Sequence, residues 1–302
     1  MTDTTTAREG TIVAVNGSQI FVTDTGGPGP AVVMLHGGGP GASGTSNYSR
    51  NIDALAASFR VIVPDMPGYG RSAKFVDQDD PVGYLATMIG GLLDEMGVGR
   101  AHLVGNSLGG AAALRLAMDS PSHVARLVLM GPGGIGNTTT GPPTDGLISL
   151  LTYYGGDGPS REKLAAFIRT YLVYDGAAVP DELIDLRYEA SIDPEVVANP
   201  PLRPPSGPNA QRWLQRMDLT LDSRLQQVEN PTLILWGRDD QVNRPAGGPM
   251  LLDVMPNAEL VMTSRTGHWM QWERADLFNQ LVTDFLSPES NFVAPESKPA
   301  TA

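Results

Sequence analysis

The segment "HLVGNSLGGAAALRLAMDS", residues 102–120, decides the fold of this chain. An apolar run ends at Gly105, a serine follows at position 107, and an alanine-rich helical pattern begins after Gly109. The spacing matches G-x-S-x-G, a sharp strand-to-helix turn in which missing β-carbons relieve the crowding around the serine. Ordinary glycine-rich turns also contain such a pentapeptide by chance. Here both flanking elements are present, so the segment predicts a strand, a tight turn that carries Ser107, and a helix.

Outward from this turn, short apolar runs rich in β-branched residues alternate with helical patterns. Their apolarity is continuous, which is typical of parallel strands buried on both faces. Strands that alternate with helices indicate a doubly wound α/β sheet. A hairpin is expected over residues 11–25, with its turn at Asn16-Gly17. The other expected strands are 31–36, 60–65, 101–105, 126–131, 232–237 and 259–263, and the expected helices are 84–98, 108–119 and 274–286.

The alternation stops between residues 132 and 229, where helical patterns and a proline-rich piece (199–208) contain no convincing buried strand. We interpret this region as a helical cap, or lid, inserted into a core domain made of residues 1–131 and 230–287. Residues 288–302 are expected to form a disordered tail, because they are rich in proline, serine and glutamate.

The overall charge and the lack of cysteine exclude several classes of function. Of 302 residues, 21 are Lys or Arg and 33 are Asp or Glu, which gives a net charge of −12. Such an acidic chain is not expected to bind nucleic acid, which requires basic surfaces. Without cysteine, disulfides, thiolate zinc sites and thiol nucleophiles are excluded. No leader pattern or membrane-spanning apolar run is present in the sequence, so a cytoplasmic location and no membrane partner are expected.

A serine hydroxyl becomes a strong nucleophile only when a base removes its proton. The chain has four histidines. His36 belongs to an "HGGG" turn, His102 opens the strand before Ser107, and His123 lies in a polar loop. His268, in "RTGHWMQWE", follows a strand and precedes the last helix, which is where the chain order Ser…Asp…His requires the base.

The acid that orients the base is expected in "WGRDDQVNRP" (236–245), directly after a strand. The Gly-x-x-Asp spacing favours Asp240, and Asp239 remains the alternative, more typical of a loop carboxylate. Ser107, Asp240 and His268 then form the predicted triad: nucleophile, orienting acid, and general base that later acts as acid. No pair of histidines has metal-ligand spacing, so neither a metal nor another cofactor is expected.

Donors for a developing oxyanion are expected in "HGGGPGASGTSN" (36–47), which follows the strand before it. The backbone N–H of Gly38 or Gly39 would act together with that of Leu108, the residue after the nucleophile. A phosphate-binding loop is disfavoured, because no G-K-[ST] follows the glycines. "GPGGIG" (131–136) formally matches a dinucleotide-binding pattern, but it leads into no helix and is interpreted as the entry to the cap.

With these residues placed, the sequence resembles the α/β-hydrolase family over nearly its full length. More narrowly, it resembles the meta-cleavage-product hydrolases, which hydrolyse a C–C bond in dienoic acids from bacterial aromatic and steroid degradation. The resemblance implies an α/β-hydrolase fold, no cofactor, and the triad named above. It rests on "LHGGGPGASGTSNYSRNID", "VPDMPGYGRS", "LVGNSLGG", "RLVLMGPGG", "WGRDDQVN" and "GHWMQWERADLFNQLVTDFL".

The resemblance also implies substrate contacts by Asn47, Asn106, Arg187 and Trp269. Arginine can form a bidentate pair with a carboxylate, asparagine can bind a carboxylate or enol oxygen, and tryptophan provides an apolar wall. Each residue also has an ordinary structural interpretation: a solvated helix charge for Arg187, a turn for Asn47, and packing for Trp269. The implied partner is a small-molecule carboxylate substrate, and the oligomeric state stays open, a homo-oligomer included.

Two departures from the family pattern leave the substrate open. Thr45 stands where many members have a bulky aromatic residue, and "NPPLRPPSGPNAQRW" (199–213) is atypical. The sequence therefore predicts a serine hydrolase that cleaves a C–C bond in a 2-hydroxy-6-oxo-dienoate. The alternative is an esterase for monoalkyl phthalate-type esters, a related activity that uses the same triad. A non-catalytic binding protein on this fold is a further alternative, and the intact triad argues against it.

Overall fold

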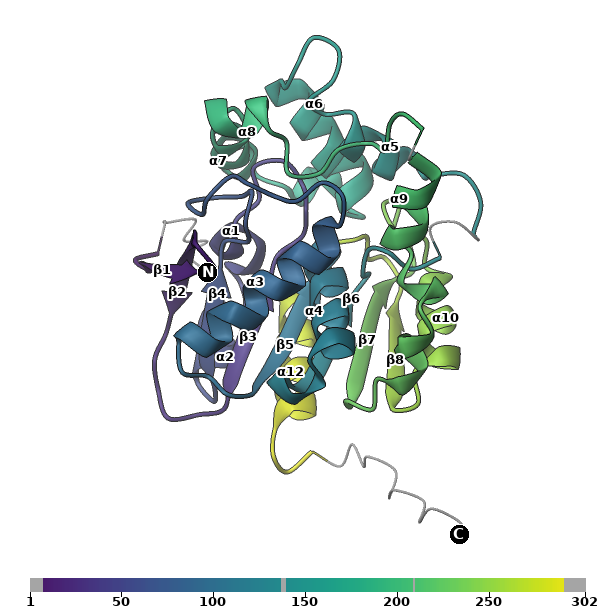
Figure 1. Ribbon diagram of the computed structural model, residues 1–302. Helices are drawn as coiled ribbons and strands as arrows, with labels where there is room; N and C mark the ends of the chain where they lie inside the picture. Colours follow the sequence, from purple (N-terminus) through teal and green to yellow (C-terminus); the bar gives the residue numbers. More distant parts are fainter. Residues whose placement is uncertain (1–7, 137–139, 209, 291–302) are drawn as a thin grey trace.

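The computed structural model describes residues 8–136, 140–208 and 210–290. At its centre is an eight-stranded sheet with the spatial order β1-β2-β4-β3-β5-β6-β7-β8 (Figure 1). β2 pairs antiparallel with β1 and β4, and all other neighbouring strands are parallel, which confirms the predicted doubly wound sheet. The strands are β1 (Thr11–Val15), β2 (Ser18–Asp24), β3 (Ala31–Leu35), β4 (Arg60–Pro64), β5 (Ala101–Asn106), β6 (Val124–Met130), β7 (Thr232–Gly237) and β8 (Ala258–Thr263).

Helices cover both faces of the sheet, because successive side chains of its strands point to opposite sides. In β3, Val33 and Leu35 pack into the cluster beneath the first group of helices, and Val32 and Met34 pack into the cluster on the other face. The first group is α3 (Pro81–Glu95), α4 (Leu108–Asp119) and α10 (Gly247–Val254). The second is α1 (Gly44–Tyr48), α2 (Ile52–Ala56), α11 (Met270–Glu273) and α12 (Ala275–Leu286).

The helix expected over residues 84–98 is α3, and it spans Pro81–Glu95 instead. It begins earlier because the carboxylate of Asp80 accepts the N–H of Gly83 at 3.0 Å, with a proline at the first helical position. It ends earlier because Gly97 adopts a positive φ of 66°, a conformation that terminates helices.

Between β6 and β7 the described residues of 132–229 contain helices and no strand. We call them the cap segment, and Figure 1 shows its helices α5 to α8 lying above one end of the sheet. Its residues between Leu150 and Ile184 form a separate apolar cluster with Val242, Trp269 and Trp272 from the core. Its last part packs on the core instead, because Met217, Leu219, Leu225 and Val228 belong to the cluster beneath α3 and α4. Its main elements are α5 (Asp145–Leu151), α6 (Arg161–Ala166), the π-helical turn η2 (Phe167–Leu172), α7 (Asp181–Ser191), α8 (Pro194–Ala198) and α9 (Ala210–Met217).

The predicted turn between β5 and α4 is present, and its geometry explains both glycines. Ser107 has φ 53° and ψ −115°, a strained conformation for a residue with a side chain. A β-carbon at Gly105 would lie 2.5 Å from the carbonyl oxygen of Gly109, and one at Gly109 would overlap the carbonyl oxygen of Leu35. The serine N–H donates to the carbonyl of Met130 in the neighbouring strand at 2.9 Å. The turn is therefore wedged between two strands.

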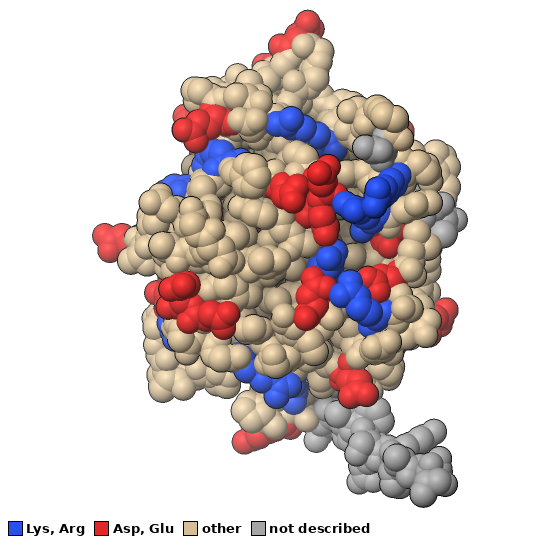
Figure 2. Space-filling view, in the orientation of Figure 1, with Lys and Arg blue, Asp and Glu red and all other residues tan. Residues whose placement is uncertain are grey.

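Charged side chains of both signs are interspersed over the face shown in Figure 2. The ion pairs of Arg115 with Asp80 and Asp119, and of Arg224 with Asp119 and Asp222, are examples of this mixing. Within the described ranges, no helix has the length and apolar character needed to cross a membrane. The tail expected over residues 288–302 falls mainly on 291–302, which lie outside the described residues.

We expect Gly109→Ala to destabilise the protein by at least about 2 kcal/mol, because the added methyl group meets the backbone of β3 and has no room to move. Urea unfolding monitored by circular dichroism measures the change. Gly99→Ala is the matched control, because a β-carbon there meets no atom within 4 Å, and it should change the free energy of unfolding by less than about 0.5 kcal/mol. Equal effects of the two substitutions would contradict this account of the turn.

Candidate active site

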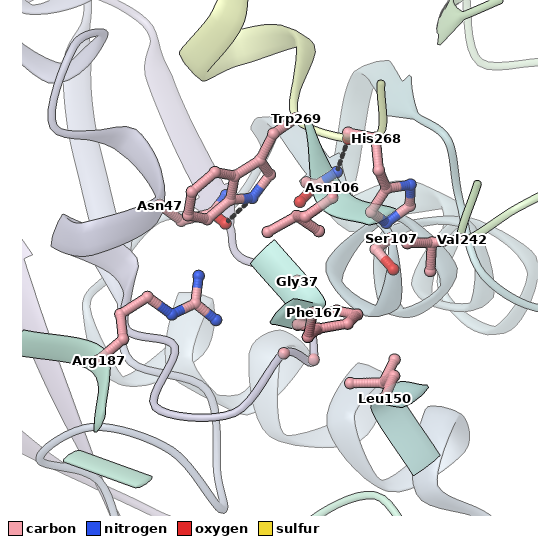
Figure 3. Close-up of a pocket in the computed structure, with 13 residues that line it drawn as sticks. Gly37, Asn47, Asn106, Ser107, Leu150, Phe167, Arg187, Val242, His268 and Trp269 are labelled. Atoms are coloured by element: carbon pink, nitrogen blue, oxygen red, sulfur yellow. Dashed lines mark hydrogen bonds between the residues drawn. The ribbon is translucent and has the colours of Figure 1, made fainter. Parts of the chain in front are cut away.

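Three residues that follow separate strands meet beside one pocket. Ser107 follows β5, Asp240 follows β7 by three residues, and His268 lies in the loop between β8 and α11. Figure 3 shows the His268 ring next to Ser107, and both line the pocket. Parallel strands bring their carboxyl ends to the same edge of a sheet, which is why residues 28 to 161 positions apart can meet there.

Asp240 is buried against His268, and its two oxygens are fully engaged. Oδ2 accepts from His268 Nδ1 at 2.7 Å and from the indole N–H of Trp236 at 3.1 Å. Oδ1 accepts the backbone N–H groups of Val242 and Asn243 at 2.8 and 2.9 Å. These four donors fix the carboxylate, and the carboxylate in turn fixes the orientation of the imidazole.

Asp239, the alternative acid, occupies a different place. Its Oδ2 accepts the backbone N–H of Thr266 at 3.4 Å, and Asp240 alone of the two aspartates contacts His268. The other ring nitrogen of His268, Nε2, is buried and has no hydrogen-bond partner among the described residues. That nitrogen is free to take a proton from the hydroxyl of Ser107.

The "HGGG" turn runs closely across the serine. A β-carbon at Gly37 would lie 3.4 Å from Cβ of Ser107, and one at Gly38 would lie 2.9 Å from the side chain of Leu108. The backbone N–H groups of Gly38, Gly39 and Leu108 donate to no other described residue. Unoccupied N–H groups beside a nucleophile are the geometry that oxyanion stabilisation requires.

His36 explains how this turn is held, a role that the sequence analysis missed. Its Nε2 accepts the backbone N–H of Met66 at 2.9 Å, so the proton of the neutral ring is on Nδ1, which donates to the carbonyl of Gly37 at 2.9 Å. Burial lowers the pKa of His36 to about 4 and keeps the ring neutral. His36 therefore ties the turn after β3 to the loop after β4. The histidine of the "HGGG" pattern was the sequence feature from which this role could have been predicted.

Two buried asparagines line the pocket, each with one amide atom unpaired among the described residues. Asn47 Oδ1 accepts the indole N–H of Trp269 at 3.0 Å, which leaves its Nδ2 without a partner. Asn106 Nδ2 donates to the carbonyls of His268 and Met130 at 3.3 and 3.4 Å, which leaves its Oδ1 without a partner. A donor and an acceptor are thus available to a bound polar ligand.

Arg187 enters the pocket from α7 and is only 1% exposed. Its Nε and Nη2 donate to the carbonyl of Pro40 at 3.1 and 2.9 Å, and its guanidinium lies 5.0 Å from the ring centre of Trp269. Burial lowers the pKa of Arg187 to about 10, so the side chain keeps its charge at neutral pH. No described carboxylate forms an ion pair with it. A buried cation without an acidic partner favours an anionic ligand.

The pocket has a polar side and an apolar side. Figure 3 shows the guanidinium of Arg187 across the pocket from Ser107 and His268. The apolar wall is formed by Leu150, Phe167, Leu172, Val242 and Trp269. Sequence patterns did not identify the first four, because helical periodicity cannot tell which cap residues face the pocket, and no pattern shows which way Val242 points in the loop after β7. Within the described part of the chain, no group of three or more acidic or histidine side chains could hold a metal ion.

Fold and site together define a serine hydrolase of the α/β type. The family model described as alpha/beta hydrolase fold matches residues 30–275, and the chain belongs to the α/β-hydrolase family. It is 42% identical over 278 residues to a 2-hydroxy-6-oxononadienedioate/2-hydroxy-6-oxononatrienedioate hydrolase of a Pseudomonas species, covering 90% of this chain and 93% of the relative. It is 40% identical over 275 residues to a 2-hydroxy-6-oxo-6-phenylhexa-2,4-dienoate hydrolase of Burkholderia cepacia, covering 89% and 91%.

Solved structures agree with this relationship. The meta-cleavage product hydrolase of Pseudomonas fluorescens, crystallised with acetates, superposes with a TM-score of 0.80 at 34% identity. The match covers 91% of this chain and 97% of that one. The predicted resemblance to meta-cleavage-product hydrolases is confirmed, and the chain is an enzyme.

We expect Asp240→Asn to lower kcat by about 10³- to 10⁴-fold, because an amide cannot hold the imidazole in the same tautomer or stabilise its charge. Asp239→Asn is the matched control in the adjacent position, and its kcat should stay within about threefold of the wild type. Steady-state kinetics on any ester or dienoate that the enzyme turns over measures both. A large loss of kcat in Asp239→Asn with none in Asp240→Asn would show that Asp239 is the orienting acid.

His102 and His123 lie away from the pocket. His102 is in β5, where burial lowers its pKa to about 4 and the nearby Arg126 and Arg100 act in the same direction. His123 is partly exposed, and its Nε2 lies 3.0 Å from a carboxylate oxygen of Asp94. The lowered pKa of His102 links the stability of the sheet to pH.

As the pH falls, the unfolded chain protonates His102 near 6.5, before the folded chain does. The stability that neutral His102 contributes is therefore complete above that pH and is lost as the pH falls toward 4. His102→Phe should shrink the fall in unfolding free energy between pH 7 and pH 5 by roughly 1–2 kcal/mol. Urea titrations at the two pH values test this, with His123→Asn as the control. An identical fall in wild type and His102→Phe would refute the assignment.

Proposed function

We propose that this chain hydrolyses the C–C bond next to the 6-oxo group of a 2-hydroxy-6-oxo-dienoate, with Ser107 as nucleophile. The observation that carries the proposal is the buried guanidinium of Arg187, which forms no ion pair with a described carboxylate and lies across the pocket from Ser107 and His268. A substrate with a carboxylate at one end and a ketone at the other can pair with both sides at once. The relatives named as dienoate hydrolases support the same substrate class.

In this arrangement the carboxylate of the substrate pairs with Arg187, and its 2-oxygen meets the free amide atoms of Asn47 and Asn106. The planar dienoate lies between Phe167 and Trp269, which exclude water from the reacting atoms. The 6-oxo carbon then reaches Ser107. Binding energy from the carboxylate end is thereby used to position the ketone.

The bond can break only if the departing carbon carries its electron pair into a stabilised group. The proton of the 2-hydroxyl must first be transferred to C5, which turns the 2-oxygen into a ketone and C5 into a saturated carbon. When the C5–C6 bond then breaks, its electrons pass along the chain to the 2-oxygen. Proton transfer to the departing dienolate, from the imidazolium that His268 becomes when it accepts the serine proton, completes the five-carbon dienoate product and returns His268 to its neutral form. In this proposal Arg187 and the free Nδ2 of Asn47 stabilise the negative charge on the 2-oxygen, and Oδ1 of Asn106 accepts the hydrogen bond of the 2-hydroxyl.

At the ketone, Ser107 Oγ attacks C6 and its proton passes to His268 Nε2. Asp240 stabilises the imidazolium that results. The negative charge on the 6-oxygen is stabilised by the backbone N–H of Leu108 together with that of Gly38 or Gly39. After the bond breaks, the acyl group remains on Ser107. Water, activated by His268, releases it as the second carboxylic acid and restores the serine.

A paired steady-state assay tests the proposal. We expect kcat/KM to be at least about a hundredfold higher for a 2-hydroxy-6-oxo-dienoate than for a monoalkyl phthalate, a preference of about 2.7 kcal/mol in the transition state. Ser107→Ala should lose turnover of both substrates with an unchanged circular dichroism spectrum. The reverse preference would identify an esterase built on the same triad, and full activity of Ser107→Ala would exclude both.

The role of Arg187 is tested by comparing a substrate that has a carboxylate with one that has none. Arg187→Gln should lower kcat/KM for the dienoate by roughly ten- to a hundredfold, because a charge-assisted hydrogen bond is lost. Hydrolysis of p-nitrophenyl acetate, which has no carboxylate, should change by less than about threefold. Arg212→Gln, an exposed arginine of the same cap segment, is the matched control. Equal losses on both substrates would show that Arg187 does not recognise the carboxylate.

A further inference from the structure

The loop that carries His268 is held tightly between the sheet and the cap segment. On the sheet side, a β-carbon at Gly237 would overlap the carbonyl oxygen of Gly267. On the cap side, a β-carbon at Gly267 would lie 2.9 Å from the carbonyl oxygen of Leu172 and from the backbone of Val173. The position of the imidazole therefore depends on the backbone at the end of η2 as well as on Asp240.

Two polar bridges join the same pieces of backbone. The N–H of His268 donates to the carbonyl of Leu172 at 2.9 Å. One residue earlier, the N–H of Gly267 donates to Oε2 of Glu273 at 2.8 Å, and Oε1 of Glu273 accepts the N–H of Tyr174 at 2.6 Å. Glu273 thus links the His268 loop to the cap through both of its oxygens.

Among the described residues, the side chain of Glu273 has no positively charged partner that would explain why a carboxylate is partly buried there. Glu273 is the last residue of α11 and is partly buried, and it forms no ion pair with a described cation. A carboxylate that serves only backbone N–H groups from two separate segments acts as a clamp between them.

The segment that Glu273 holds is continuous with the pocket wall. Phe167 and Leu172, at the two ends of η2, both line the pocket, and Tyr174 follows two residues later. The clamp therefore connects the wall that faces a ligand to the loop that carries the base. A shift of η2 would reach His268 through this connection.

We propose that Glu273 is a positioning residue for His268, which it holds in place for proton transfer by clamping the Gly267 N–H to the Tyr174 N–H of the cap segment. The inference rests on the proposed role of His268 as general base. Glu273 does not touch the reacting atoms in this account. It acts by keeping the imidazole within reach of Ser107, where small displacements are costly.

Glu273→Gln is the direct test. The amide has only one acceptor oxygen, so its NH₂ group would face one of the two backbone N–H groups, of Gly267 or of Tyr174, and that hydrogen bond would be lost. Burial raises the pKa of Glu273 to about 7, so assays at pH 8 examine the ionised clamp. We expect kcat on the dienoate to fall at least about tenfold while KM changes less than about twofold. Glu229→Gln, at an exposed glutamate before β7, should leave both constants unchanged.

The rate at which a fluorophosphonate labels Ser107 separates positioning from simple stability. Labelling needs the base His268 but no substrate carboxylate, so Glu273→Gln should slow it by about the same factor as kcat. A substitution that only loosens the fold lowers the melting temperature without changing this rate in the remaining folded protein. The melting temperature of each variant is therefore measured in parallel.

A second pair of variants removes the same hydrogen bond from the cap side. Tyr174→Pro lacks the backbone N–H, and Val173 before it is already extended (φ −121°, ψ 157°), as a residue before proline must be. Tyr174→Ala keeps the N–H and is the control for the loss of an exposed ring. We expect the proline variant to reproduce the slow labelling of Glu273→Gln and the alanine variant to label like the wild type.

Labelling within twofold of the wild type in either Glu273→Gln or Tyr174→Pro, with the protein folded, would overturn the proposal. A loss of melting temperature without slower labelling would do the same. His268→Ala distinguishes this failure from failure of the proposed function. If His268→Ala labels normally, the base itself is wrongly assigned; if it does not label and Glu273→Gln labels normally, only the clamp is wrong.

Discussion

The close approach of the β5–α4 turn to β3 is the constraint on which the rest of the site depends. Ser107 can keep its positive φ only because Gly105 and Gly109 leave space for the neighbouring backbone. That same contact brings the turn after β3 over the serine, so that its N–H groups and that of Leu108 share one small volume. The cost of the strained backbone is met by packing on both faces of the sheet. The positions of the proposed nucleophile and of the proposed oxyanion donors are therefore consequences of one steric fit.

The pocket contains a positive charge, whereas the chain as a whole is negatively charged. A net charge of −12 gives an anion no general attraction to this protein. In the proposed binding mode Arg187 compensates, because it is buried against the carbonyl oxygen of Pro40 and the ring of Trp269, where water does not screen its charge. One desolvated guanidinium can thus define the recognition of an anion on an acidic protein.

The fold, and the meeting of Ser107, Asp240 and His268 at one edge of the sheet, could be predicted from the sequence because their signals are local. A strand, a glycine-flanked serine and a helix follow one another within twenty residues, and the aspartate and histidine each follow a recognisable strand. The choice between Asp239 and Asp240 rested on spacing alone, since only the folded loop shows which carboxylate faces the imidazole. The pocket-facing roles of Phe167 and Leu150, and the bridge made by His36, depend on how distant segments pack, and no local pattern encodes that.

The position of the cap in the chain has a consequence for how such enzymes can diversify. Because β6 and β7 are parallel neighbours, the chain leaves the sheet at the carboxyl end of β6 and returns at the amino end of β7, so the segment inserted between these two strands also runs back along the length of the sheet. A replacement of different length or helix number could be accommodated there without changing the register of any strand. The contacts at Leu172 and Tyr174 limit that freedom, since a foreign cap would also have to bring one carbonyl and one N–H to the histidine loop. Relatives could then differ in substrate range through replacement of the whole cap. Each new cap would still have to keep the hydrogen bonds that hold the histidine loop.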